Sequence, residues 1–246
     1  LIMRLRISHR TSYHYDEPVH FALQQLRKTP RSSPMQSIVS WNMSLEGAKQ
    51  ELSFSDQHTN HVILSSIEPG LTEMTIMCEG EIDTHETHGV LGFEVQHAPL
   101  WYYHRETPMT TVGPELRKLL KALPHEDSEL SRMHTLSALI RDRVAYETGH
   151  TEVTTTAEES LKAGHGVCQD HTHIFIAAAR AIGFPARYIS GYLMMDDRID
   201  QDAAHAWAEV FLADIGWVGF DVSNVISPDE RYVRVASGLD YKEAAP

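Results

Sequence analysis

Apolar and polar residues alternate in several short runs through the N-terminal part of the chain. These runs cover residues 3–15, 37–45, 61–67 and 71–82. Alternation with a period of two is typical of β-strands that bury one face. Turn signals, among them Glu46-Gly47 and Pro69-Gly70, separate the runs. Short strands and turns at this spacing predict a small antiparallel sheet or sandwich.

After Gly113-Pro114, apolar residues recur at the spacing of an α-helix. Pro114 suits the first turn of a helix over residues 115–123, and Pro124 ends it. The next predicted helix carries its apolar residues on one stripe, formed by Leu130, Met133, Leu136, Ile140 and Val144. Residues 156–159 have the capping-box pattern and open a short helix that ends at Lys162.

A glycine-rich turn, Gly164-His165-Gly166, precedes a predicted helix from about Cys168 to Ile182. Gly183 and Pro185 supply its stop signal. Residues 174–179 are apolar on every face of this helix, so we expect it to be buried.

The last part of the chain is predicted as strands over residues 186–193, 204–212, 217–222 and 232–236. The alanine-rich segment 203–212 would also suit a helix. A strand is favoured because 217–222 resembles its hairpin partner across a turn at Gly216. Helices followed by an antiparallel sheet predict an α+β core over residues 106–246, after an N-terminal β domain over residues 1–105.

The composition of the chain argues against several classes of protein, among them nucleic-acid-binding and membrane-spanning proteins. The chain has 246 residues, enough for one large domain or two ordinary ones. A net charge of −13, from 21 basic and 34 acidic residues, argues against nucleic-acid binding, which requires a basic patch. No apolar run approaches the ~20 residues of a membrane span. Residues 1–6 do not indicate a secretory signal, and Met3 is the expected natural start.

The two cysteines, Cys78 and Cys168, do not make a disulfide framework for a chain of this size, which favours a reducing, cytoplasmic location. Cys78 lies in a plain strand pattern and is expected to be a core residue. Cys168 lies at the first turn of a buried helix, where unpaired N–H groups and the helix dipole favour a thiolate. A thiolate there would be a nucleophile, and the same N–H groups would hold an oxyanion. A buried structural cysteine is the alternative.

A thiolate nucleophile requires a base, normally a histidine oriented by a third group. His205 lies among small residues, and Asp221 ends an otherwise apolar strand. If a three-residue loop places Leu212 opposite Gly216, Trp207 faces Asp221. His205 and Asp221 are then diagonal neighbours on one face, with Cα atoms ~7–8 Å apart. A loop of even length would put them on opposite faces, so an odd loop or a bulge is predicted.

Three blocks of sequence, at residues 164–192, 205–209 and 216–221, carry a resemblance to a known family. Gly164-His165-Gly166-Val167-Cys168-Gln169-Asp170 resembles the G-x-G-x-C-x-D motif of bacterial transglutaminase-like proteins. The segments 178–192, 205–209 and 216–221 are similar to theirs in the same order, so the resemblance covers about residues 130–240. A looser similarity links the N-terminal region to the β domain that precedes this core. It rests on Thr11-x-Tyr13-x-Tyr15, Gln25-Leu26-Arg27, Pro30-Arg31 and Gln36.

The resemblance implies a papain-like α+β core that cleaves amide bonds or transfers acyl groups through a thioester. Cys168 would be the nucleophile, His205 the general base and acid, and Asp221 the orienting carboxylate. Two features depart from the family pattern. Val222 stands where a proline is expected after the triad aspartate, and the chain ends at Pro246, where relatives usually continue with another strand.

Further residues are candidates for oxyanion or substrate contacts: Tyr146, Gln169 and Trp207. By resemblance, Tyr146 lies where similar proteins place an aromatic ring near the thiol, although a packing role suits it equally well. Trp207 is expected in the wall of the core or of a cleft. Asp170 and Arg187 are expected to form a buried structural pair.

Two alternatives to the enzyme remain open. Cys168, His171 and His173, with His165 near them, would suit a metal site, but His173 would not share a helix face with the other two. A non-catalytic binding module on the same fold is the second alternative, and the complete Cys/His/Asp set argues against it.

The enzyme prediction leaves the acyl acceptor undecided. A peptide or protein substrate with an amide group is expected, without a cofactor or metal. Hydrolysis, as in a protease or amidase, is favoured over acyl transfer to an amine because water is always present.

Overall fold

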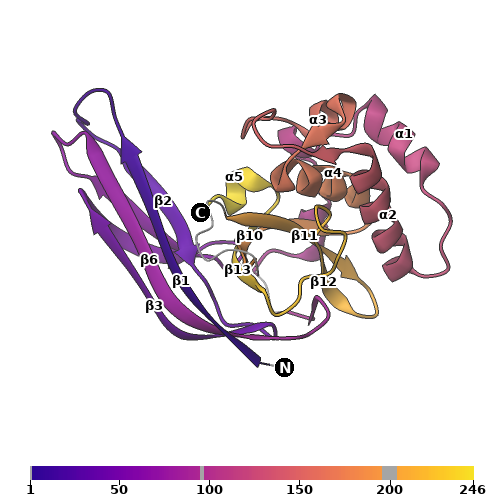
Figure 1. Ribbon diagram of the computed structural model, residues 1–246, viewed down its shortest axis with the longest axis horizontal. Coiled ribbons are helices and arrows are strands. Elements are labelled where there is room, and N and C mark those ends of the chain that lie inside the picture. The colour runs from indigo at the N-terminus through magenta and orange to yellow at the C-terminus, as the bar shows by residue number, and fades with distance from the viewer. Residues whose placement is uncertain (1, 95–96, 196–203) are drawn as a thin grey trace.

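The computed structural model describes residues 2–94, 97–195 and 204–246. The N-terminal part consists of two three-stranded antiparallel sheets (Figure 1). One has the strand order β1-β6-β3, with bounds Ile2–His14, Glu73–His85 and Gln36–Glu46. The other has the order β2-β5-β4, with bounds Leu23–Thr29, His61–Ile67 and Ala48–Ser55.

Side chains from both sheets form one buried core. Leu26 and Ile63 of the second sheet pack with Met74, Ile76 and Cys78 of β6. This arrangement confirms the predicted antiparallel sheet or sandwich. The prediction missed β2 and β4, because β4 is exposed at seven consecutive positions and β2 is mostly polar, so neither shows a clear alternating pattern.

The C-terminal part is built on a five-stranded antiparallel sheet of order β13-β10-β11-β12-β7. Its strands are Tyr232–Gly238, Ala186–Leu193, His205–Leu212, Gly216–Phe220 and Val90–Gly92, in that order. Four helices lie beside this sheet, on the side away from the N-terminal sheets (Figure 1). They are α1 (Pro114–Ala122), α2 (Glu129–Arg143), α3 (Ala157–Ala163) and α4 (Cys168–Ala181). The predicted helices and the strand at 205–212 are therefore confirmed.

Short elements complete this part. The 3₁₀ helices η1 and η2 cover Leu100–His104 and Pro108–Thr110, and α5 covers Tyr241–Ala244. Two short parallel strands, β8 (Ala145–Tyr146) and β9 (His165–Gly166), pair just before α4 begins. No helix of the described residues is both long and apolar enough to span a membrane.

Helix α4, which begins at Cys168, is the centre of the main core. Its residues Ile174, Phe175 and Ile176 have no exposed surface, and they pack with Tyr188 of β10 and Ala208 of β11. The predicted burial of this helix is confirmed. Burial on all sides fixes the position of the first turn of α4 relative to the sheet.

The N-terminal part closes the outer edge of the five-stranded sheet. The Gln36 side chain donates to the carbonyl of Arg234 and accepts from its N–H, both at 2.8 Å. Asn60 makes the same pair of bonds to Ser237, at 2.7 and 2.9 Å. Two amide side chains thus satisfy backbone groups on the outer side of the edge strand β13, whose other side pairs with β10.

Strand β7 precedes residue 105 in the chain but pairs with β12 of the C-terminal sheet. A domain boundary at residues 105–106 therefore stays a prediction.

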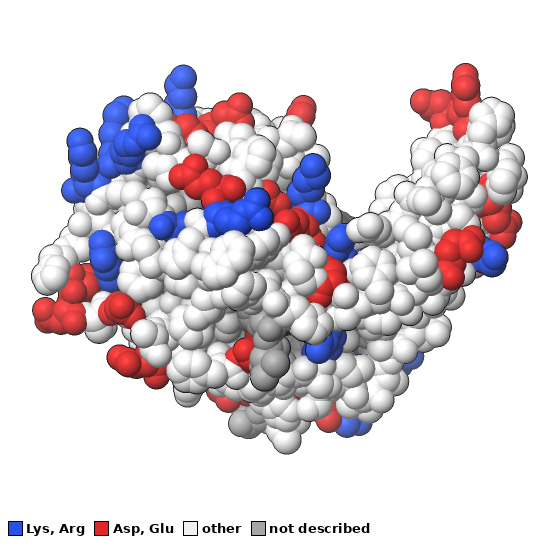
Figure 2. Space-filling model, turned by 180° about the vertical axis from the view of Figure 1, so that it is seen from behind, with Lys and Arg blue, Asp and Glu red and all other residues white. Residues whose placement is uncertain are grey.

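Figure 2 shows a hollow between the projecting N-terminal strands and the rest of the molecule. It also shows Lys and Arg side chains gathered at the upper left.

Candidate active site

Cys168 is the first residue of α4, as the sequence predicts. The turn before it is held by the Asp170 carboxylate, which accepts from the Val167 N–H at 2.8 Å and from the Thr151 hydroxyl at 2.7 Å. Asp170 also explains Gly166, because a Cβ at this position would lie 2.7 Å from the Asp170 Cβ. The G-x-G-x-C-x-D spacing thus places a capping carboxylate over the backbone that presents the thiol.

The predicted pair of Asp170 and Arg187 is wrong. Arg187 instead binds Glu209 at 2.5 Å and Glu94 at 2.6 Å, and its guanidinium lies 3.9 Å from the ring centroid of Trp217. The reason is the alternation of β10. Tyr188 faces the helices, so Arg187 points to the opposite face of the sheet, away from α4.

The hairpin of β11 and β12 has the predicted register. Leu212 pairs with Gly216 across a three-residue loop, and Ala208 pairs with Phe220. Continuing this register by one step brings Trp207 opposite Asp221. His205 Nε2 lies 2.6 Å from Asp221 Oδ2, so the diagonal relationship expected from the loop length is confirmed.

The protonation of His205 follows from its partners. A carboxylate can only accept, so Nε2 carries the proton and Nδ1 is left to face a second group. Burial lowers the pKa of His205, but hydrogen bonds to Asp221 and Cys168, and the charges of both, raise it to about 10. Burial likewise raises the pKa of Asp221, but its hydrogen bonds, led by that from His205, lower it overall. The structure therefore pairs His205 with Asp221, and the pKa of His205 responds to Cys168 as well.

Two residues that the sequence analysis missed also bind Asp221. The Tyr232 hydroxyl and the Asn224 side-chain amide each donate to Oδ2 at 2.7 Å, and the Asn224 N–H donates to Oδ1 at 3.3 Å. The sequence gives a weak signal for Asn224, because aspartate side chains in turns often accept from a backbone N–H a few residues further on. Asp221 accepts from the Asn224 N–H in this way. Tyr232 comes from the edge strand β13, and no local pattern indicates it.

His171 links helix α4 to the loop after Asp221. Its Nε2–H donates to the Val144 carbonyl at 2.9 Å, and its Nδ1 lies 2.8 Å from the Ser223 hydroxyl. Burial lowers the pKa of His171, which keeps the ring neutral and lets Nδ1 accept from Ser223. Arg141 holds the same loop through the Ser223 carbonyl at 3.1 Å.

Two histidines of the alternative metal site, His171 and His173, have hydrogen-bond partners of another kind. His171 uses both ring nitrogens as described, and His173 Nε2 accepts from the Tyr241 N–H at 3.1 Å. Over residues 2–94, 97–195 and 204–246, no three His, Cys, Asp or Glu side chains are grouped to hold a metal ion.

The three further candidates occupy different positions. Burial, followed by the charges of Cys168 and Asp221, raises the pKa of Tyr146, which places its half-exposed ring in the electrostatic range of the predicted triad. Gln169 uses its side-chain amide to bind the Val153 carbonyl at 3.0 Å. Trp207 is buried, and its ring stacks on that of His205 with centroids 6.4 Å apart. Their roles in oxyanion or substrate binding stay predictions.

Cys78 is buried, whereas Cys168 is partly exposed. Cys78 lies in the interior of β6 and is buried in the sandwich core, and this burial raises the pKa of its thiol. The expectation of a core residue is confirmed.

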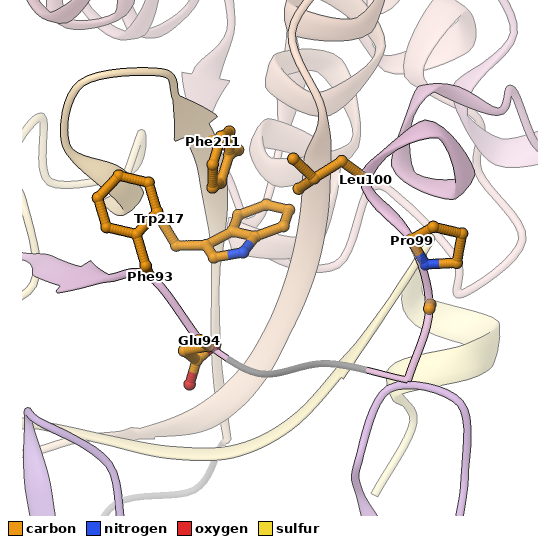
Figure 3. Close-up of a pocket in the computed structure, with 7 residues that line it drawn as sticks. Phe93, Glu94, Pro99, Leu100, Phe211 and Trp217 are labelled. Atoms are coloured by element: carbon orange, nitrogen blue, oxygen red, sulfur yellow. The ribbon is translucent and has the colours of Figure 1, made fainter.

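Two cavities lie at different ends of the hairpin. One, of about 280 Å³, lies at its turn end, where the aromatic residues Phe93, Phe211 and Trp217 surround it (Figure 3). The other, of about 420 Å³, adjoins the predicted triad, because Asn224 and Tyr232 line it and both bind Asp221. Its remaining lining is mostly apolar, from Leu193, Met194, Met195 and Ile226, with Arg231.

Comparison with known proteins assigns the family. Residues 117–222 match the transglutaminase-like superfamily, and residues 5–83 match the bacterial transglutaminase-like N-terminal region. The chain therefore belongs to the transglutaminase-like superfamily and carries the N-terminal region of its bacterial members.

Relatives cover nearly the whole chain. An uncharacterized protein of Mycobacterium leprae is 25% identical over 256 residues, spanning 99% of this chain and 91% of that protein. An uncharacterized protein of Mycobacterium tuberculosis H37Rv is 29% identical over 270 residues, spanning 99% and 86%. The fold is shared with "a Putative Cysteine Protease from Cytophaga hutchinsonii", with a TM-score of 0.76 and 20% identity over 100% of this chain and 86% of that one.

Proposed function

We propose that this protein is a cysteine-nucleophile enzyme that acts on amide bonds through a thioester intermediate. The observation that carries the proposal is the 2.6 Å contact of His205 Nε2 with Asp221 Oδ2, in a histidine that also interacts with Cys168. A thiol, an imidazole and a carboxylate connected in this order are the parts needed for nucleophilic acyl transfer. Membership of the transglutaminase-like superfamily supports the same chemistry.

In the first half of the reaction, the Cys168 thiolate attacks the amide carbonyl carbon. The N–H groups in the first turn of α4 stabilise the oxyanion, since they have no partner within the helix. Imidazolium His205 donates its Nδ1 proton to the leaving nitrogen, the C–N bond breaks, and a thioester to Cys168 remains. Asp221 holds the ring by its Nε2–H and stabilises the imidazolium before the transfer.

In the second half, neutral His205 takes a proton from the acyl acceptor, which attacks the thioester and releases the Cys168 thiolate. Water as the acceptor gives a carboxylic acid, as in a protease or amidase. An amine gives a new amide, as in a transglutaminase. We favour hydrolysis, because water reaches any open site and no amine-binding group is evident among the described residues around the predicted triad.

The proposed substrate is a peptide or protein that carries a reactive amide, without a cofactor, nucleic acid or membrane partner. The cavity of about 420 Å³ beside Tyr232 and Asn224 offers room for part of such a substrate. We also propose a cytoplasmic location, which the two unpaired cysteines, one of them the proposed nucleophile, support.

The experiment is to incubate the protein with a peptide library and search by mass spectrometry for acylated Cys168. Cleaved peptides indicate hydrolysis, and conjugates formed with an added primary amine indicate acyl transfer. Cys168→Ala is the control, and Cys78→Ala should keep the activity. Absence of acylated Cys168 and of any product, in protein that is folded, would contradict the proposal and favour a non-catalytic binding module.

A further inference from the structure

Tyr232, which is not one of the three predicted catalytic residues, makes a hydrogen bond to Asp221. Its hydroxyl donates to Oδ2 at 2.7 Å, and Oδ2 also accepts from His205. Its ring lies 6.0 Å from the His205 ring and meets Trp207 edge to face, with centroids 5.4 Å apart. The side chain is buried, at 2% exposure, so this geometry is held by packing on several sides.

The hydroxyl can act only as a donor to the carboxylate. Burial, then the charge of Asp221 and the hydrogen bond to it, raise the pKa of Tyr232 well above its usual value. The phenol therefore keeps its proton wherever Asp221 is ionised. A hydrogen bond to the charged form of a carboxylate favours that form.

We propose that Tyr232 is a positioning residue of the active site, which keeps Asp221 ionised and aimed at His205 through its hydroxyl. This inference rests on the proposed function. It also assigns a task to the N-terminal part of the chain, because Gln36 binds both backbone groups of Arg234, two residues beyond Tyr232 on the same edge strand. The support for the carboxylate thus extends from the N-terminal β-sheets through β13 to the triad.

Asn224 donates to the same oxygen but is held differently. It is exposed and lies in the turn after Asp221, whereas Tyr232 is fixed by β13 and by the ring of Trp207. Further titratable groups that act on Asp221 or Tyr232 come from neighbouring elements: Tyr146 from β8, His171 from α4, and Asp229 from the loop before β13. None of these three is hydrogen-bonded to Asp221 among the described residues.

The test is the rate of Cys168 alkylation by iodoacetamide as a function of pH, in the wild type and in Tyr232→Phe. Without the donor, Asp221 takes up a proton at higher pH and the imidazolium loses its counter-charge. We expect the acidic limb of the profile to move upward by about one pH unit. Phenylalanine keeps the ring, so a role limited to packing would leave the profile unchanged.

Two further variants complete the design. Tyr192→Phe also removes a partly buried phenol hydroxyl, but that hydroxyl lies 2.8 Å from His9 Nδ1, and the variant should keep the wild-type profile. Asn224→Ala removes the exposed donor to Oδ2 and should shift the limb in the same direction as Tyr232→Phe, which keeps the test valid if that variant folds poorly. A wild-type profile in folded Tyr232→Phe would overturn the inference, whatever Asn224→Ala shows. If Tyr232→Phe does not fold, a wild-type profile in Asn224→Ala would overturn it. Slow, ordinary alkylation in the wild type itself would instead overturn the proposed function.

Discussion

His205 Nε2 and Asp221 Oδ2 lie 2.6 Å apart, although the two residues are 16 positions apart in the chain. The three-residue turn between β11 and β12 produces this contact, because it sets the register that puts both side chains on one face. The proposed chemistry therefore depends on a hairpin whose length is readable in the sequence.

Removal of the Asp221 charge tests this contact directly. We expect Asp221→Asn to lower the rate of peptide turnover by roughly two to four orders of magnitude, since the amide neither stabilises an imidazolium nor fixes the Nε2–H tautomer. The measurement is kcat/KM with any peptide found to acylate Cys168. Asp214→Asn, in the turn of the same hairpin, is the matched control. A loss of less than tenfold would show that Asp221 is not part of the reaction.

The second prediction concerns pH and stability. Burial, followed by the charge of Arg180, lowers the pKa of His173 from 6.5 to about 3. A folded-state pKa below the unfolded value means that the unfolded chain binds the proton more strongly. The stabilising effect is complete above pH 6.5 and is lost progressively as the pH falls from 6.5 toward 3.

Urea unfolding at pH 7, 6 and 5 measures this loss in the wild type and in His173→Gln, whose amide oxygen can still accept from the Tyr241 N–H. The difference between the two proteins in the pH dependence of the unfolding free energy isolates His173 from the other histidines. We expect a shallower decline in the variant. Parallel curves would contradict the prediction.

The third prediction concerns the two hydrogen bonds between the Gln36 side chain and the backbone of Arg234, which connect the N-terminal sheets to β13. Gln36→Ala leaves the N–H and carbonyl of Arg234 without the side chain that satisfies them, and it should destabilise the protein by about 1–3 kcal/mol. Chemical denaturation measures the change. Gln50→Ala, on the exposed strand β4, is the matched control and should change stability little. Equal effects of the two substitutions would show that the hydrogen bonds of Gln36 to Arg234 contribute no measurable stability.

The parts of the fold that could be predicted were those with a strong local signal. The buried helix α4 follows from its apolar run and its glycine turn, and the β11–β12 register follows from the count of turn residues. Strands β2 and β4 carry polar residues at most positions, because each contributes few side chains to the sandwich core. Their place in the sheet is set by pairing with β5, which local periodicity does not show.

The residues of the candidate site also fall into those that the sequence indicates and those that only the structure shows. Cys168, His205 and Asp221 stand out because their residue types are unusual at their positions. Tyr232 lies 11 residues beyond Asp221, in a strand that reaches it only through the order of the sheet. The mistaken pairing of Asp170 with Arg187 has the same origin, since the two lie on opposite sides of the sheet in space. Contacts between distant elements required the structure.

The most direct test of a His205-activated thiol is the alkylation of Cys168 by iodoacetamide against pH, in the wild type and in His205→Ala, with buried Cys78 as the reference in the same molecule. The account predicts that Cys168 reacts fast well below pH 8.5, about where an ordinary thiol is half ionised. His205→Ala should slow the reaction at neutral pH by at least about tenfold, the factor for one pH unit. A slow wild-type reaction with the profile of an ordinary thiol, unchanged in His205→Ala, would contradict it.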